Sequence, residues 1–231
     1  MTNFEIIKNH WQQEREKTSS DPWMKRLSSG EMDVCHYLGF LLETYHNTGY
    51  NPQLQAYASM YIENNPRHIV KKFYQHAISE IGHDLLALSD LKNLGVDEDF
   101  VKNSKPLPMT TAFFASAVWG IQRKGPMYYL GYLFHLEFSP TESGKQHVDM
   151  LLKKGIPANA VSFLQEHSEV DIGHNKLMEH YVADLVQTAH DMDIMKESLS
   201  VCVDLHTKML KAAFENGEKL FGPKLKASAS F

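Results

Sequence analysis

The sequence is short of cysteine, of arginine and of long apolar runs, and each shortage excludes a class of protein. The two cysteines, Cys35 and Cys202, make neither a disulfide framework nor a zinc ribbon. Four scattered arginines and a net charge of -5 argue against nucleic acid, which binds clustered cations. No apolar run could cross a bilayer, and the first residues lack the apolar core of a signal peptide. We therefore expect a cytoplasmic protein with neither a membrane nor a nucleic-acid partner.

Proline and glycine are also sparse, at 9 and 13 of 231 residues, and they interrupt the chain at regular places. Between these breaks, apolar residues recur at helical spacing without β-branched runs, so the sequence predicts seven to nine helices and no sheet. No low-complexity tract or linker divides the chain, and its length suits one medium domain. The predicted fold class is all-α, a single-domain helical bundle over residues 1–231.

Individual glycines and prolines predict where these helices end or break. Gly95 and Gly155 are typical of helix C-termini. A further helix begins near Pro126, and we expect Pro140 and Gly144 to interrupt it, because proline removes a backbone donor from the helix.

Histidine is abundant, with 13 residues, and two stretches arrange it in the same way. The first contains His76, Glu80 and His83, the second contains His167, Asp171 and His174, and in both Ile-Gly directly precedes the last His. Residues spaced i, i+4 and i+7 share one face of a helix, so each triad is expected to point one way. The glycine predicts close packing, because it removes a side chain where another helix or a ligand approaches.

Imidazole and carboxylate together suit iron, manganese or zinc, and a helical bundle can direct several such faces at one interior point. Two triads supply enough ligands for two ions. A lone His on an apolar face is usually a hydrogen-bonded core residue. Composition alone, however, predicts roughly 0.1 occurrences of the full pattern in such a chain, so the repeat favours metal binding.

A further carboxylate is needed to bridge two cations, and Glu137 is the best candidate. It lies in the apolar segment "YLGYLFHLEFSPTESG", where a buried carboxylate needs a metal or another partner. The alternative is an exposed helix residue, since Glu is mostly exposed.

Weaker candidates accompany these residues. His36 and Glu43 are also seven apart, which makes them candidates for the substrate pocket or for support of the metal ligands, although core packing or exposure explains them as well. Cys35 lies beside His36, yet adjacent helical residues diverge, so an activated thiol is poorly supported. His135 and four other histidines have no such neighbours, and no role is assigned to them.

At these residues the sequence resembles the haem-oxygenase-like di-metal oxidases, the iron-containing redox enzymes that share a fold with haem oxygenase, TenA and PqqC. The resemblance covers about residues 31–190. It implies that six residues hold a non-haem di-iron centre, which activates dioxygen to oxidise a small organic substrate: Glu80, His83, Glu137, His167, Asp171 and His174. It also implies that the segment "EFSPTESG" is the broken helix over the active site. His76 departs from the family pattern. The alternatives for this residue are an additional ligand, a support for a ligand or a substrate contact.

Other readings stay open. Iron–manganese could replace the two irons, PqqC-like oxidases are rich in His without metal, and a homodimer is an open expectation. A TenA-like aminopyrimidine hydrolase needs a nucleophilic Cys in a convincing setting. A haem-binding module without turnover would use His10 or His36, but it leaves both triads unexplained.

Overall fold

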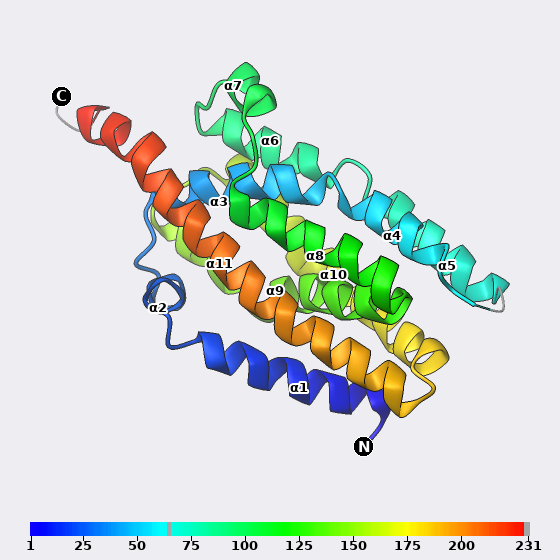
Figure 1. Cartoon of the computed structure of the whole chain (residues 1–231). Helices are drawn as coiled ribbons and strands as arrows, with labels where there is room; N and C mark the ends of the chain where they lie inside the picture. The colour runs from blue at the N-terminus through cyan, green and yellow to red at the C-terminus, as the bar shows by residue number, and fades with distance from the viewer. Residues whose placement is uncertain (64–65, 229–231) are drawn as a thin grey trace.

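In the computed structural model, which describes residues 1–63 and 66–228 with the side chains of 169–172, 174 and 224–228 left out, helices make up the whole architecture (Figure 1). The described residues form eleven α-helices and one short 3-10 helix. They are α1 (Asn3–Thr18), α2 (Pro22–Ser29), α3 (Val34–Thr48), α4 (Asn51–Ser59), α5 (Arg67–Ser79), α6 (His83–Asn93), α7 (Glu98–Asn103), α8 (Pro108–Lys124), α9 (Pro126–Lys153), η1 (Ala158–Ala160), α10 (Ser162–Leu185) and α11 (Ala189–Ser228).

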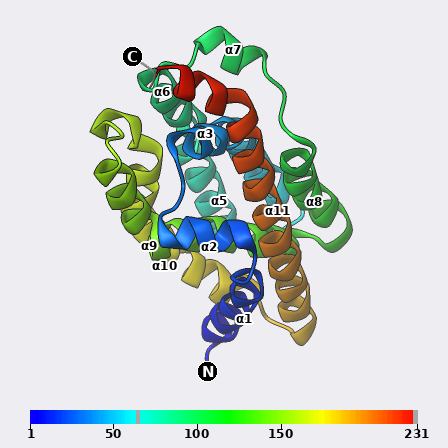
Figure 2. The same ribbon diagram turned by 90° about the vertical axis from the view of Figure 1, so that its left-hand side faces the viewer.

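Three long helices organise the bundle. Helix α9 packs between α10 and α11, and α11 also packs along α3 and α1. Both ribbon views show α3 beside α11, with α6 next to α3 (Figures 1 and 2). Helices α3, α5, α6, α9 and α10 thus surround one interior region, and this region receives residues from both histidine-rich stretches.

Glycine permits the closest helix crossings. A Cβ on Gly39 of α3 would lie 2.1 Å from the carbonyl oxygen of Ala213 and 2.9 Å from Cα of Gly217, both on α11. A Cβ on Gly131 of α9 would lie 2.6 Å from Cβ of Ser198, also on α11. Only a residue without a side chain lets these backbones meet at such distances.

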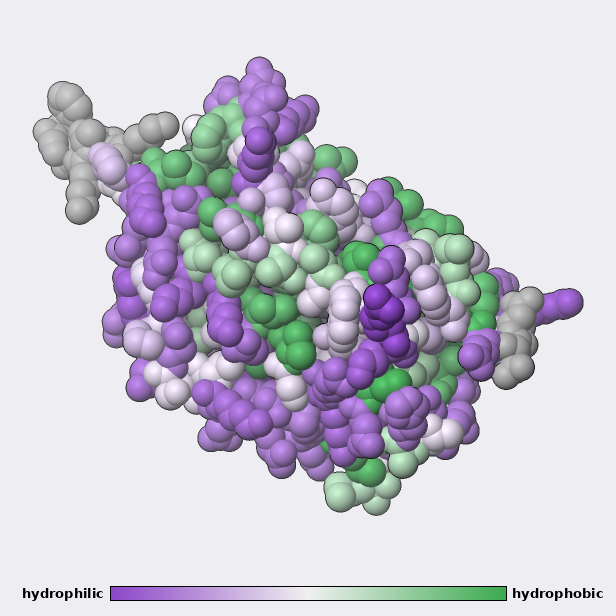
Figure 3. All heavy atoms as spheres, viewed as in Figure 1, coloured by the Kyte–Doolittle hydropathy of each residue, from purple (hydrophilic) through white to green (hydrophobic). Residues whose placement is uncertain are grey.

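Two apolar clusters fill the bundle. The larger one gathers around α9 and includes Trp11, Phe73, Phe113 and Phe134, all without exposed surface. The smaller one lies between α3, α6 and the start of α10. Hydrophilic residues cover most of the face in Figure 3, with hydrophobic ones gathered in small groups. None of the helices in the described part of the chain combines the length and hydropathy that crossing a bilayer requires.

The all-α prediction is confirmed, but three details of it are wrong. Short helices such as α2, α4 and α7 raise the count above nine. Helix α9 continues through Pro140, since its packing against α10 and α11 holds the helix across the missing backbone donor. The first histidine-rich stretch is not one helix, because α5 ends at Ser79 and α6 begins at His83. The ends at Gly95 and Gly155 are as predicted, with φ of 81° and 85°.

Candidate metal centre

A break between α5 and α6 sets the position of the first two candidate ligands. Glu80 ends α5, and its backbone N–H still donates to the carbonyl of His76. Gly82 then takes φ 95°, a left-handed conformation that glycine adopts at little cost, and α6 starts at the next residue, His83. A Cβ on Gly82 would meet nothing within 4 Å. This glycine therefore serves the turn and not the close packing that the sequence predicted.

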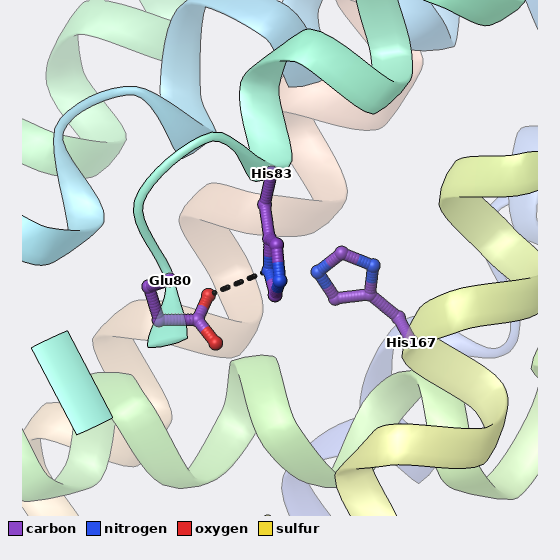
Figure 4. A group of neighbouring side chains, drawn as sticks. All are labelled: Glu80, His83 and His167. Carbon is purple, nitrogen blue, oxygen red and sulfur yellow. Dashed lines mark hydrogen bonds and ion pairs between the residues drawn. The ribbon is translucent and has the colours of Figure 1, made fainter. Parts of the chain in front are cut away.

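One group of side chains across this break consists of Glu80, His83 and His167 (Figure 4). One candidate ligand atom from each residue lies within 4.8 Å of the other two. Nδ1 of His83 is 3.1 Å from Oε2 of Glu80, and the rings of His83 and His167 are 4.8 Å apart at 74°. Figure 4 shows the Glu80 carboxylate pointing at the ring of His83, with the ring of His167, which comes from α10, on the other side of the His83 ring.

The ring of His167 is held in the orientation that a metal ligand needs. Its Nδ1 lies 2.8 Å from the carbonyl oxygen of Phe163, and a carbonyl only accepts, so Nδ1 carries the proton and Nε2 keeps its lone pair. Metal-binding histidines commonly donate their second N–H in this way. Burial lowers the pKa of His167, which favours the neutral ring that binds cations.

A second group joins His76 and Glu137 to the same Glu80. Nε2 of His76 is 3.1 Å from Oε1 of Glu137 and 3.7 Å from Oε1 of Glu80. The three residues are 3%, 7% and 5% exposed for His76, Glu80 and Glu137, so the alternative of an exposed Glu137 is wrong. Glu80 belongs to both groups, and two three-residue sets therefore meet at one carboxylate.

Gln55 and Tyr129 form hydrogen bonds that hold the ring of His76. Nδ1 of His76 is 3.1 Å from Nε2 of Gln55, and the hydroxyl of Tyr129 donates to Oε1 of Gln55 at 3.2 Å. The sequence did not single out either residue, although a glutamine in a predicted helix face that is otherwise apolar is a usable signal. These contacts fix the imidazole ring from the side opposite Glu137.

Four candidate residues from the sequence belong to neither group of described side chains. The side chains of Asp171 and His174 lie outside the described residues, so their predicted ligand roles stay predictions. His36 and Glu43 fall in neither group. Nε2 of His36 is 2.7 Å from Glu218, and Glu43 accepts bonds from the first turn of α8 and the residue before it.

Asp90 joins the two helices that carry His83 and His167, a role that sequence reasoning missed. Its carboxylate has no exposed surface and accepts from the backbone N–H of Ser162 at 3.0 Å and of Phe163 at 2.9 Å. The hydroxyl of Ser162 donates to it as well, at 2.6 Å. Asp90 of α6 therefore caps the N-terminus of α10.

We expect Asp90→Ala to lower the free energy of unfolding by about 3 kcal/mol, because two buried N–H groups lose a charged acceptor. Urea denaturation measures this loss. The control is Asp97→Asn, at an exposed cap of α7 where Asp97 accepts from the N–H of Phe100. Asparagine caps equally well there, so the control should change stability by less than about 0.5 kcal/mol. Equal stability of the two variants would contradict the capping role.

A cavity of about 680 Å³ adjoins the two groups. Glu80, Glu137 and His167 form part of its wall, and further residues of α9 and α10, with residues of α1, α2, α3, α4 and α11, form the rest. The cavity is large enough for a small organic molecule. The candidate ligands thus lie beside a space in which such a molecule can be held.

Comparison with known proteins gives a family match and a fold. A family model described as iron-containing redox enzyme matches residues 38–203, and no curated protein matches the chain. A domain of unknown function with a haem oxygenase-like fold, from Shewanella denitrificans, is 25% identical, with a TM-score of 0.79 over 94% of this chain and 92% of that one.

Two more distant structures show the same fold. A TenA homologue from P. horikoshii is 13% identical, with a TM-score of 0.75 over 93% of this chain and 99% of that one. A CadD-like protein of unknown function from Nostoc punctiforme is 15% identical, with a TM-score of 0.69 over 92% and 99% of the two chains. The predicted haem-oxygenase-like fold is therefore confirmed.

Proposed function

The chain belongs to the family of iron-containing redox enzymes, and from this we propose that it is a non-haem di-iron oxidase or oxygenase acting on a small organic substrate and dioxygen. The observation that carries the proposal is the sharing of Glu80 between two three-residue groups. One carboxylate with a set of donors on either side matches what two neighbouring cations require.

The donor types fit iron. His83 and His167 stand on one side of Glu80, and His76 and Glu137 stand on the other. Imidazole and carboxylate bind iron well, and the cost of burying Glu80 and Glu137 falls when a cation neutralises them. A manganese ion in one position fits the same donors, so iron–manganese is a variant of this proposal.

Each side chain has a distinct task at such a centre. His83 and His167 would anchor one ion, and His76 would either anchor the other or hold Glu137 by a hydrogen bond. Glu80 would hold both ions, and carboxylates tolerate changes of binding mode as the metal changes valence. When bound, the two ions supply the redox chemistry that activates dioxygen. The buried walls around Glu137 and Tyr129 keep bulk water from the reacting atoms.

TenA-like hydrolysis, the rival activity, lacks support in the structure. It needs an activated thiol, but burial raises the pKa of Cys35 and raises that of Cys202 well above its usual value. Neither thiol lines the cavity. No observation favours the haem-binding module over the oxidase, and an absorption spectrum of the purified protein tests for haem directly.

We expect Glu137→Gln to reduce bound iron from two ions per chain to one or none and to abolish dioxygen consumption, because an uncharged amide is a weaker ligand for iron than a carboxylate. Elemental analysis of protein produced in iron-supplemented medium measures the first effect, and an oxygen electrode measures the second. The free energy of unfolding of the metal-free protein should stay equal or rise, since a buried carboxylate is removed.

The matched control is Glu142→Gln, on the same helix, where Glu142 pairs with Arg15 near the surface. This control should keep both ions. Full iron content in Glu137→Gln would remove Glu137 from the centre, and wild-type protein without iron or manganese would contradict the proposed function itself.

A further inference from the structure

Three aromatic nitrogen-bearing side chains form a hydrogen-bonded chain that ends at the cavity. Nε1 of Trp11 donates to Nδ1 of His135 at 3.0 Å. Nε2 of His135 is 2.7 Å from Nδ1 of His206. Trp11 has no exposed surface and His135 is 4% exposed, while His135 and His206 both line the cavity.

The direction of every bond in this chain follows from the indole. Indole N–H can only donate, so Nδ1 of His135 must be the unprotonated acceptor. The proton of His135 is then on Nε2, which donates to Nδ1 of His206. By the same reasoning the proton of His206 is on Nε2. His206 therefore offers an N–H donor to a molecule in the cavity.

This assignment of protons requires the imidazole rings of His135 and His206 to be uncharged. Burial lowers the pKa of His206 to about 4, and the bond from the indole of Trp11 leaves His135 with a proton on Nε2 only. The donor of His206 is thus a neutral N–H over the whole physiological pH range.

An acceptor faces the same cavity from α3. The hydroxyl of Tyr132 donates to Oδ1 of Asn51 at 3.2 Å. Burial raises the pKa of Tyr132, and Asn47 is a neighbour that partly offsets this effect. Asn47 carries an amide, whose oxygen can accept a hydrogen bond. Its Oδ1 is buried and finds no hydrogen-bond partner among the described residues, although Asn47 lines the cavity and is 5% exposed.

One aromatic ring links the two groups. The ring of Phe113 packs against Tyr132 with centroids 5.0 Å apart and against His206 at 5.2 Å. His206 and Asn47 both line the cavity, and both border the aromatic pair of Phe113 and Tyr132.

The cationic side chains of the wall are already paired. The two that line the cavity are Arg15 and Lys154. Arg15 pairs with Glu142, and Nζ of Lys154 is 3.9 Å from Asp33. An anionic substrate group beside His206 would therefore lose its hydration without gaining an unpaired cation, which is costly. An ammonium group has no lone pair, so it could not accept the N–H of His206.

We propose that His206 and Asn47 bind the non-reacting end of the substrate, and that this end is a neutral polar group with both an acceptor and a donor, such as a carboxamide or a hydroxyl. The proposal rests on the proposed function only in taking this cavity as the substrate cavity. Such a cavity selects neutral organic molecules over carboxylates and amines of the same shape.

Binding of three matched probes to metal-free protein tests the proposal: 4-phenylbutanamide, 4-phenylbutanoate and 4-phenylbutan-1-amine. By calorimetry, the amide should bind at least about tenfold more tightly than either charged probe. His206→Phe and Asn47→Leu should each weaken amide binding by about fivefold to tenfold and reduce the preference over the carboxylate. His206→Gln keeps a hydrogen-bond donor, so it should retain most of the amide affinity and most of the preference for the amide over the carboxylate.

Nitrogen NMR of the histidine rings checks the donor directly and needs no variant. It should find His206 protonated at Nε2 and unprotonated at Nδ1. The opposite tautomer, tighter binding of the carboxylate, or failure of the amide to bind would overturn the proposal. Iron content separates this result from the proposed function, because His206→Phe and Asn47→Leu should keep wild-type iron whether or not they bind the amide.

Discussion

Glu80→Gln is expected to remove both iron ions and all dioxygen consumption. Glu80 is the one residue that belongs to both ligand groups, with His83 and His167 on one side and His76 and Glu137 on the other. Replacing its carboxylate by an amide takes a charged ligand from each ion at once. Loss of one supporting contact already lowers metal affinity by about 10–100-fold, so loss of a shared ligand should lower it by more than about 100-fold. Elemental analysis after dialysis measures the result.

Two further variants make this test specific. His167→Ala removes a ligand from one group only, so it should leave more iron bound than Glu80→Gln. Glu43→Gln changes another buried glutamate, 1% exposed, whose carboxylate accepts from the N–H of Leu107, and it should keep both ions. Equal iron loss in all three variants would indicate general destabilisation and would contradict the shared role of Glu80.

Gly39→Leu is expected to destabilise the whole bundle. A Cβ at Gly39 would lie 2.1 Å from the carbonyl oxygen of Ala213, and this neighbour is backbone that cannot rotate away. The reciprocal contact is equally close, since a Cβ on Gly217 would lie 2.1 Å from the carbonyl oxygen of Cys35. Leucine would force α3 and α11 apart, at a cost of at least about 3 kcal/mol. Urea denaturation followed by circular dichroism measures the loss.

Gly173→Ala is the matched control. Gly173 also lies within a helix, α10, but a Cβ there would meet no atom of the described residues within 4 Å. Alanine is the better helix former, so this variant should gain about 0.5–1 kcal/mol. A Gly39→Leu protein as stable as the wild type would show that the two backbones do not need to touch.

Much of the protein could be predicted from local sequence. Apolar residues at helical spacing, with few glycines and prolines, indicate an all-α bundle, because the same periodicity that builds a helix also buries one of its faces. The repeated His and acidic residues identified both segments that form the candidate centre. Glu137 was found because a carboxylate in an apolar helix needs a partner. The fold class and the burial of Glu137 could be predicted because each depends on residues close together in the chain.

The tertiary structure decided what depends on distant residues. Gly82 turns the chain between α5 and α6. His76, Glu80 and His83 have the spacing of one helical face, but they lie on both sides of this turn. Tertiary packing selects the turn over a continuous helix. Glu80 is shared because α9 brings Glu137 to one side of it and α10 brings His167 to the other. The donor on His206 depends on Trp11, which lies far away in sequence but is joined to it through His135. Periodicity tells which face of a helix is buried, but it carries no information on which other helix that face meets.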